Sequence, residues 1–380
     1  MTHPLTIGTA VAAPGQIVYG KFDGVPLPTG GADFFPVIIA QGRADGPVLW
    51  LTGSIHGNEY TGLAVIHRLL GPNGSDFPLR DLRGTVIMVP TLNPAGLRTG
   101  SRSPYYLYGA DPNRLFPAPI RQGGRPHPEA DANDTAPSVL ERAYERLFAE
   151  IETTADYLID LHNAVIGSLP FAFRDPVYYD GNVEGAREAA RRLQSTTDAM
   201  LEAFGFPVIN EFPSAEYLKK QLHRSVSGSV LLKARKPAFT VELSSYLHVN
   251  PLARDAAVVG IRNVMRWAGM LPGPREALPP IPRPKVNFPV RRMMAPRAPQ
   301  SGIVTHLVRE GDVIQSGQAV ARLTDIFGRP LGPEGGLIRA EHDGYVVGLM
   351  QGIVFYENEP VIWMAVRDSG DLLLPYPEDY

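Results

Sequence analysis

Cysteine is absent from this chain of 380 residues. The absence excludes disulfides, thiolate zinc fingers, iron–sulfur clusters and a cysteine nucleophile. Any metal site in the protein must therefore be built from histidine and carboxylate side chains.

Long apolar runs and a strong net charge are also absent. No stretch approaches the roughly 18 apolar residues that a membrane-spanning helix needs. Residues 1–20 contain no Lys or Arg and no continuous apolar run, which argues against a signal peptide. The 36 Lys and Arg against 39 Asp and Glu give a formal net charge of −3, which leaves no electrostatic footprint for nucleic acid or an anionic membrane. We expect a cytoplasmic protein that acts on a small molecule, with homo-oligomer formation left open.

Two common catalytic motifs are missing as well. No Gly-rich phosphate-binding loop follows a predicted strand, and the Gly-x-Ser-x-Gly elbow of serine hydrolases does not occur. Both absences weaken a nucleotide-binding or serine-nucleophile interpretation.

The first 270 residues alternate short apolar runs with helical patterns. This alternation predicts an α/β domain with helices on both faces of a sheet. We expect an N-terminal β extension over residues 1–45, a catalytic domain over 46–270 and, within it, a long loop from Ala95 to about Ala136. The predicted strands are 17–20, 35–40, 47–52, 84–89, 156–161 and 238–241, and the predicted helices are 61–70, 136–151, 185–204 and 251–267.

The composition changes after Trp267. Nine prolines lie between Pro272 and Pro299, which predicts a semi-rigid linker over residues 271–299. Residues 300–380 read as all-β with an internal repeat at a spacing of about 42 residues, which indicates a small β-barrel domain. The pattern resembles the biotinyl/lipoyl carrier domain, but the connecting turn 324–328 has no Lys, so a carrier function is rejected.

Polar residues follow three predicted strands of the α/β domain, where such enzymes place their active sites. His56 and Glu59 follow one strand, His162 follows a second and Glu242 a third. Two histidines and a glutamate with a vacant fourth position are what catalytic zinc needs, since the vacancy holds a water whose pKa falls towards about 7. The alternative is a helix-start carboxylate beside an unrelated loop histidine.

Five blocks together resemble the succinylglutamate desuccinylase/aspartoacylase family, which is related to zinc carboxypeptidases. They span about 190 residues, and the C-terminal β-barrel resembles one that many members append. In chain order they are His56-Gly57-Asn58-Glu59, Asn93-Pro94 with Arg102 downstream, Asp111-Pro112-Asn113-Arg114-Leu115-Phe116, Asp160-Leu161-His162 and Val241-Glu242-Leu243. The resemblance implies a three-layer α/β fold with a mixed central sheet.

The resemblance also implies roles for individual residues. His56, Glu59 and His162 become the ligands of one zinc ion per chain, and Glu242 becomes the general base that passes a proton to the departing amine. The family usually continues this glutamate with Leu-Gly-Gly, whereas here Leu243-Ser244-Ser245-Tyr246 follows. That departure concerns the shape of the pocket wall more than the chemistry.

Further roles concern the substrate. Asn113 and Arg114 correspond to the pair that holds a substrate carboxylate, and a guanidinium fork matches a carboxylate in two places. Arg102 is the candidate for stabilising the oxyanion, with Arg98 as the alternative.

Three other residues or sets have roles that the sequence leaves open. Asp160 either orients His162 or is a plain strand-end acid, and Tyr356 of the barrel is a candidate for reaching the substrate. The residues after His162 that we considered for the pocket wall are Phe171, Phe173, Arg174 and Tyr178.

We therefore expect a zinc-dependent amidohydrolase that cleaves a linear amide other than a peptide bond, in an N-acyl amino acid or a similar small carboxylate. One rival is a metallocarboxypeptidase that uses the same site on short peptides. A second rival is a non-catalytic metal-binding scaffold in which the barrel mediates assembly.

Overall fold

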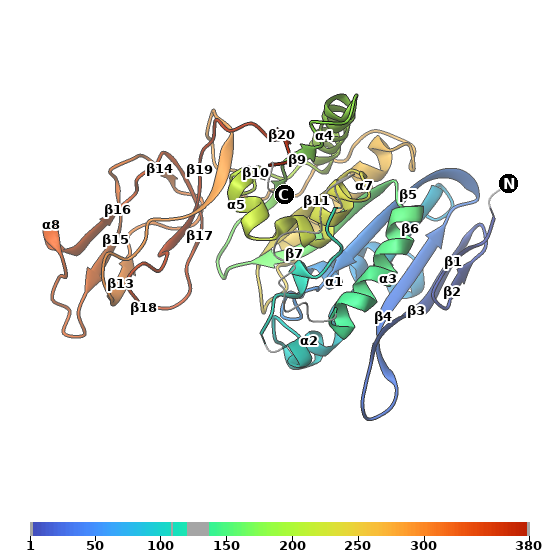
Figure 1. Ribbon diagram of the computed structural model, residues 1–380, viewed down its shortest axis with the longest axis horizontal. Coiled ribbons are helices and arrows are strands. Elements are labelled where there is room, and N and C mark those ends of the chain that lie inside the picture. Colours follow the sequence, from blue (N-terminus) through green and yellow to red (C-terminus); the bar gives the residue numbers. More distant parts are fainter. Residues whose placement is uncertain (1–2, 108, 120–136, 378–380) are drawn as a thin grey trace.

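The computed structural model describes residues 3–107, 109–119 and 137–377, and its centre is one sheet of 12 strands (Figure 1). Parallel and antiparallel neighbours both occur, so the sheet is mixed. In spatial order the strands are β14 (Val313–Ile314), β17 (Gly344–Leu349), β19 (Ile362–Arg367), β12 (Val290–Met294), β10 (Val208–Asn210), β8 (Pro170–Arg174), β11 (Ala238–Ser245), β7 (Tyr157–Ala164), β5 (Ala44–Gly53), β6 (Arg83–Val89), β4 (Ala32–Gln41) and β3 (Gln16–Pro26).

Helices cover both faces of this sheet. The helices are α1 (Thr61–Leu70), α2 (Pro94–Thr99), α3 (Val139–Thr154), α4 (Ala186–Phe204), α5 (Ser214–Lys219), α6 (Val226–Leu232), α7 (Pro251–Trp267) and α8 (Pro333–Gly336). Along β5, Trp50 packs into the core with α3 and α6, while Leu49 and Leu51 pack into the core with α1, α4 and α7. Alternate residues of a strand point to opposite faces, so the sheet is the middle of three layers. The predicted three-layer α/β fold with a mixed sheet is confirmed.

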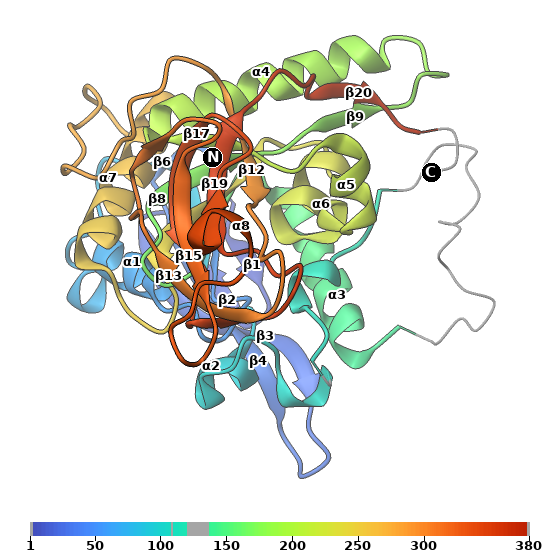
Figure 2. The ribbon, with the colours of Figure 1, turned by 90° about the vertical axis from the view of Figure 1, so that its left-hand side faces the viewer.

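Three smaller sheets complete the structure. They are β1 (Leu5–Ile7) with β2 (Ala10–Ala12), β9 (Val177–Tyr179) with β20 (Leu373–Pro375), and the four strands β16 (Leu337–Arg339), β15 (Ala319–Thr324), β13 (Gly302–His306) and β18 (Val354–Phe355). The four-stranded sheet and the β14-β17-β19 end of the large sheet enclose a separate hydrophobic core. Figure 2 views the molecule from the side on which the four-stranded sheet lies. Within the described ranges, no helix combines the length and apolar character that crossing a membrane requires.

Two predicted segments between residues 95 and 151 differ from the structure. Helix α3 begins at Val139, because Ser138 and Glu141 cap it reciprocally; the predicted start at Ala136 lies outside the described residues. The expected loop from Ala95 onward contains helix α2, which Asn93 caps by accepting a hydrogen bond from Gly96 N. Residues 108 and 120–136 of that loop also lie outside the described residues.

The expected linker 271–299 is not strand-free, which corrects the sequence analysis. Its residues 290–294 form β12, which pairs in parallel with β10 and antiparallel with β19. The prolines of this segment lie outside the strand: the last one before it is Pro289 and the first one after it is Pro296. Each residue of β12 therefore keeps its backbone N–H for pairing. The large sheet contains strands from both sides of the expected border between residues 270 and 300. The domain boundaries themselves remain a prediction.

A buried ion pair fastens β12 to the end of β19. Arg291 binds Asp368 through Nε and one terminal nitrogen, both at 2.8 Å, and its other terminal nitrogen donates to Glu211 O at 2.7 Å. Asn210 Nδ2 donates to the same Asp368 carboxylate. The side chain of Arg291 is 9% exposed and that of Asp368 is 6% exposed, so each charge is stabilised mainly by the other and not by solvent.

Replacing Asp368 tests this join. We expect Asp368→Asn to lower the free energy of unfolding by about 3–5 kcal/mol, because the buried Arg291 loses its counter-charge. Glu202→Gln breaks an exposed pair with Arg275 and should cost no more than about 1 kcal/mol. Urea unfolding of the two variants measures the difference; equal costs would contradict the prediction.

Gly57 lies where the loop after β5 touches helix α2. A Cβ at this position would lie 2.0 Å from Gly96 C and 2.3 Å from Leu97 N. Both are backbone atoms, which cannot rotate away, so only glycine fits without moving the loop that carries His56 and Glu59.

We expect Gly57→Ala to destabilise the protein by about 1–3 kcal/mol, since the added methyl group forces a backbone shift. Gly181→Ala is the matched control, because the nearest atom to its Cβ is 3.8 Å away and its φ is not positive. The control should stay within about 0.5 kcal/mol of the parent. Thermal unfolding of both variants checks the prediction, which fails if Gly57→Ala unfolds like the control.

Candidate metal centre and active site

The candidate site lies where three parallel strands end together. Strand β7 pairs in parallel with both β5 and β11, so the carboxyl ends of all three lie at one edge of the sheet. His56 and Glu59 lie in the loop between β5 and α1, and His162 lies near the end of β7. Glu242 is the register partner of His162 on β11, which places it directly beside that histidine.

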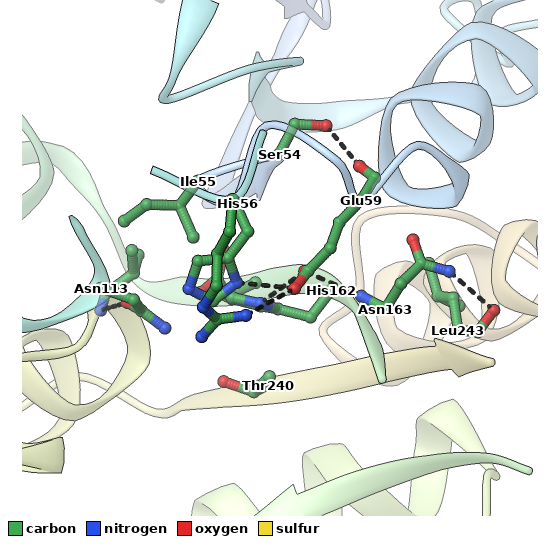
Figure 3. A network of polar contacts seen from close by, with 12 residues as sticks. Ser54, Ile55, His56, Glu59, Asn113, His162, Asn163, Thr240 and Leu243 are labelled. Carbon is green, nitrogen blue, oxygen red and sulfur yellow. Dashed lines mark hydrogen bonds and ion pairs between the residues drawn. The ribbon is translucent and has the colours of Figure 1, made fainter. Parts of the chain in front are cut away.

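His56, Glu59 and His162 converge on one point (Figure 3). Glu59 Oε1 lies 2.7 Å from His56 Nδ1, and Glu59 Oε2 lies 2.9 Å from His162 Nδ1. The ligand atoms of the three side chains all lie within 4.8 Å of one another, and all three residues are buried. This set could hold a metal ion, because neutral imidazole and carboxylate are the donors that borderline divalent ions accept.

Each histidine is oriented by a second carboxylate. His162 Nε2 lies 2.7 Å from Asp160 Oδ2, and Asp160 in turn accepts a hydrogen bond from Thr52 Oγ1. His56 Nε2 lies 3.0 Å from Asp111 Oδ1. A carboxylate on Nε2 keeps the proton there and leaves the Nδ1 lone pair for a metal ion. Asp160 therefore contacts the histidine two residues on, as one of the two sequence interpretations expected.

Burial and charge act against each other in this cluster. Burial alone would raise the pKa of Glu59, but the neighbouring His56 and His162 hold it below its usual value. Burial alone would lower the pKa of His162, yet Asp160 and Glu59 raise it well above the ordinary value. Concentrated buried carboxylates thus favour positive charge between them, either protons on the imidazoles or a metal cation.

Glu242 differs from the other carboxylates of the cluster. Glu242 as a whole is partly exposed and lines the cavity. Its Oε2 atom, however, is buried and has no hydrogen-bond partner among the described residues. Burial raises the pKa of Glu242 to about 7, and the charge of Glu59 adds to this while His162 opposes it. A carboxylate with such a pKa can both accept and return a proton near neutral pH.

The two arginines considered for the oxyanion lie in different places. Arg102 lines the cavity and reaches Asp111 at 2.9 Å and Glu59 at 3.4 Å. Arg98 instead pairs with Asp33 on β4 at 2.7 Å and is not among the residues that line this cavity. Geometry therefore favours Arg102 over Arg98.

Asn113 and Arg114 also line the cavity, in a 3-10 turn that Asp111 caps. Asn113 Oδ1 accepts a hydrogen bond from Val226 N at 2.9 Å, which leaves the Nδ2 donor for the cavity. Arg114 Nε donates to Lys220 O at 2.8 Å, which holds its guanidinium in place.

The cavity has a volume of about 360 Å³, which suits a small molecule. Of the other sequence candidates, Phe173 lines it, whereas Arg174 pairs with Asp198 and Tyr356 is 65% exposed elsewhere. Tyr246, in the stretch that the sequence analysis connected with the pocket wall, lines the cavity, but sequence reasoning missed Asp175, Glu211, Tyr217, Arg292 and Trp363. Asp175 and Glu211 directly follow β8 and β10, so recognising those short strands was the signal that could have found them.

Comparison with known proteins places this site in a family. The profile of the succinylglutamate desuccinylase/aspartoacylase catalytic domain matches residues 45–268. An N-alpha-acetyl-L-2,4-diaminobutyric acid deacetylase of Halomonas elongata is 25% identical over 317 residues, which cover 83% of this chain and 80% of the relative.

Solved structures share the fold along nearly the whole chain. The product-bound ectoine utilization protein EutE (DoeB) of Ruegeria pomeroyi has a TM-score of 0.69 at 20% identity, covering 96% of this chain and 100% of that one. A succinylglutamate desuccinylase of Silicibacter sp. has a TM-score of 0.68 at 18% identity, with coverage of 96% and 100%. The profile match spans more than half of the chain and includes His56, Glu59, His162 and Glu242. This protein belongs to the succinylglutamate desuccinylase/aspartoacylase family.

Proposed function

We propose that this protein is a zinc-dependent amidohydrolase that removes the acyl group from an N-acyl amino acid or a similar small carboxylate. The observation that carries the proposal is the buried His56–Glu59–His162 set with Glu242 beside it, at the wall of a small cavity. The Halomonas relative is named for deacetylation of an N-acetylated amino acid, which is chemistry of the same class.

The donor set supports one zinc ion per chain. Two imidazoles and one carboxylate are the protein ligands of several catalytic zinc sites, and the carboxylates on both Nε2 atoms fix the ring tautomers. When bound there, zinc supplies a Lewis acid that lowers the pKa of water and polarises a carbonyl group.

Glu242 is the residue best placed to move protons in this reaction. In the proposed mechanism its carboxylate takes a proton from the attacking water and gives it to the departing amine nitrogen. Its place beside His162 on the neighbouring strand, with an oxygen that has no hydrogen-bond partner among the described residues, suits a group that receives and passes on a proton. Arg102 points its charge into the same region and stabilises the oxyanion that forms on the acyl carbonyl.

Asn113 and Arg114 are proposed to hold the substrate carboxylate. Both lie on one turn at the cavity wall, and Arg114 is anchored through its Nε. Two guanidinium or amide N–H groups on one carboxylate fix the orientation of the substrate as well as its affinity.

The rival functions fit less well. A cavity of about 360 Å³ has room for a small acylated amino acid, whereas a carboxypeptidase also needs an open cleft for the rest of a peptide. A non-catalytic metal scaffold would not need a carboxylate with an unpartnered oxygen beside the ligand set. Zinc analysis of the purified protein, followed by a hydrolysis screen of N-acyl amino acids and C-terminally blocked peptides, tests all three functions.

We expect Glu242→Gln to lower kcat by about 10²–10⁴-fold while zinc content stays near one ion per chain, because the change removes the base and not a ligand. His162→Ala should instead lose zinc. Metal analysis and steady-state kinetics on the best substrate of the screen separate the two effects. Undiminished activity in Glu242→Gln, or a parent protein that binds no zinc, would rule out the proposed mechanism.

Arg114→Met tests the carboxylate contact. The variant should raise KM for an N-acyl amino acid by about tenfold or more, since a charged hydrogen bond is lost. The matched substrate is the same compound with its carboxylate converted to an amide, for which the variant and the parent should differ little. An equal loss on both substrates would mean that Arg114 acts through the fold alone.

A further inference from the structure

The wall of the active-site cavity changes in character along strand β11. Thr240, Glu242 and Tyr246 line the cavity in this order. At the Thr240 end, Thr240 shares a hydrogen bond of 2.8 Å with Ser227 of helix α6, and the first backbone N–H of the same helix donates to Asn113. The proposed carboxylate site therefore lies on one side of Glu242, and Tyr246 lies on the other.

The side of the cavity around Tyr246 is apolar. Tyr246 N donates to Ala164 O at 3.0 Å, which joins the ends of β11 and β7. Val165, Met294 and Trp363 also line the cavity, and all three pack in one hydrophobic cluster. We call the set of Val165, Tyr246, Met294 and Trp363 the apolar end of the cavity.

One cation touches the apolar end. The guanidinium of Arg292 lies 4.9 Å from the ring of Trp363, and its Nη1 donates to Glu211 Oε1 at 2.7 Å. An apolar group that packs beside Trp363 leaves this ion pair intact, whereas an anion would compete with Glu211 for Arg292. Besides the candidate metal ligands and Glu242, the charged residues that line the cavity are Arg102, Arg114, Asp175, Glu211 and Arg292.

Three exposed apolar side chains extend the apolar end to the surface. Ile166 is 43% exposed and Leu247 is 51% exposed, and each directly follows a residue of the apolar end. Ile353 is 62% exposed and lies two residues after Gln351, whose Oε1 accepts a hydrogen bond from the hydroxyl of Tyr246. Grouped apolar side chains on a surface are typical of a binding site. Because these three adjoin the cavity wall, a substrate that leaves the cavity at this end covers them.

We propose that the acyl group of the substrate is an uncharged, apolar chain longer than acetyl, which lies along the apolar end. This inference rests on the proposed deacylase function. The acyl chain and the amino-acid part are attached to opposite ends of a trans amide bond. With the amide at the metal site and the carboxylate at Asn113 and Arg114, the acyl chain therefore points towards Tyr246. Each methylene group that moves from water onto an apolar wall strengthens binding by up to about fourfold.

The competing interpretation is that Arg292 binds a carboxylate at the end of the acyl group. A succinyl group and a 4-methylpentanoyl group distinguish the two interpretations, because they have nearly the same shape and differ in the charge at the end. The apolar end favours the methyl groups, and a carboxylate-binding Arg292 favours the succinyl group.

The experiment uses four acyl derivatives of the amino acid that the N-acyl screen identifies: acetyl, hexanoyl, 4-methylpentanoyl and succinyl. We expect kcat/KM for the hexanoyl compound to exceed that for the acetyl compound by at least about tenfold. The 4-methylpentanoyl compound should exceed the succinyl compound by at least about tenfold as well. Cleavage without either preference, or a preference for succinyl, overturns the inference and leaves the deacylase function intact.

A charge placed in the apolar end tests its location. Val165→Asp should lower the ratio of hexanoyl to acetyl kcat/KM by at least about fivefold, because a carboxylate replaces part of the apolar wall. Val313→Asp is the matched control: Val313 is 50% exposed on β14 and is not among the residues that line the cavity, so the parental ratio should remain. If Val165→Asp does not fold, Leu247→Asp replaces it, with a smaller fall expected. A folded variant that keeps the parental ratio overturns the inference.

Binding decides the question if none of the four compounds is cleaved, which would count against the deacylase function itself. Calorimetry of the parent protein in zinc-containing buffer then compares hexanoate with acetate, the acyl parts alone. The apolar end requires hexanoate to bind at least about tenfold more tightly than acetate, and Val165→Asp to remove most of this difference. Equal or absent binding of the two acids overturns the inference.

Discussion

The site depends on one buried carboxylate, that of Glu59, which lies between two imidazoles. Each of its oxygens faces an Nδ1 atom, and Oε2 also accepts a hydrogen bond from the backbone N–H of Asn163. A carboxylate at 2% exposure is costly without such partners, so the loop after β5 and the end of β7 must meet for either to be stable. The close contact of Gly57 with α2 holds the loop in this position.

The strand register extends this constraint to Glu242, the proposed catalytic base. Because β11 pairs in parallel with β7, the residue opposite His162 lies beside the ligand set, and that residue is Glu242. Asn163 strengthens the same junction, since its side chain donates to the carbonyl groups of Leu243 and Ser245. Backbone pairing therefore sets the distance between Glu242 and His162.

Much of this arrangement could be predicted from sequence. The features that could not be predicted leave no pattern within a few residues of the chain. The strand–helix alternation and the motifs around His56, His162 and Glu242 are local patterns, readable within a few residues. Strand β10 has three residues and β8 has five, too few to show a clear alternation of apolar and polar residues. The sequence therefore did not indicate that the acids after these strands, Asp175 and Glu211, line the cavity. Asp111 stood inside a recognised motif, but its contact with His56 spans 55 residues, and no local pattern reports such a contact.

The proline-rich segment shows how the remaining part of the site depends on tertiary pairing. Strand β12 lies between β10 and β19, and its Arg292 reaches the cavity together with Trp363 from β19. Arg291, the preceding residue, points to the opposite face of the strand and makes the buried pair with Asp368. One residue of β12 therefore fixes the C-terminal strands to the sheet while the next supplies a charge to the cavity wall. The C-terminal strands are thus part of the pocket itself, since the indole of Trp363 and the guanidinium of Arg292 pack against each other there.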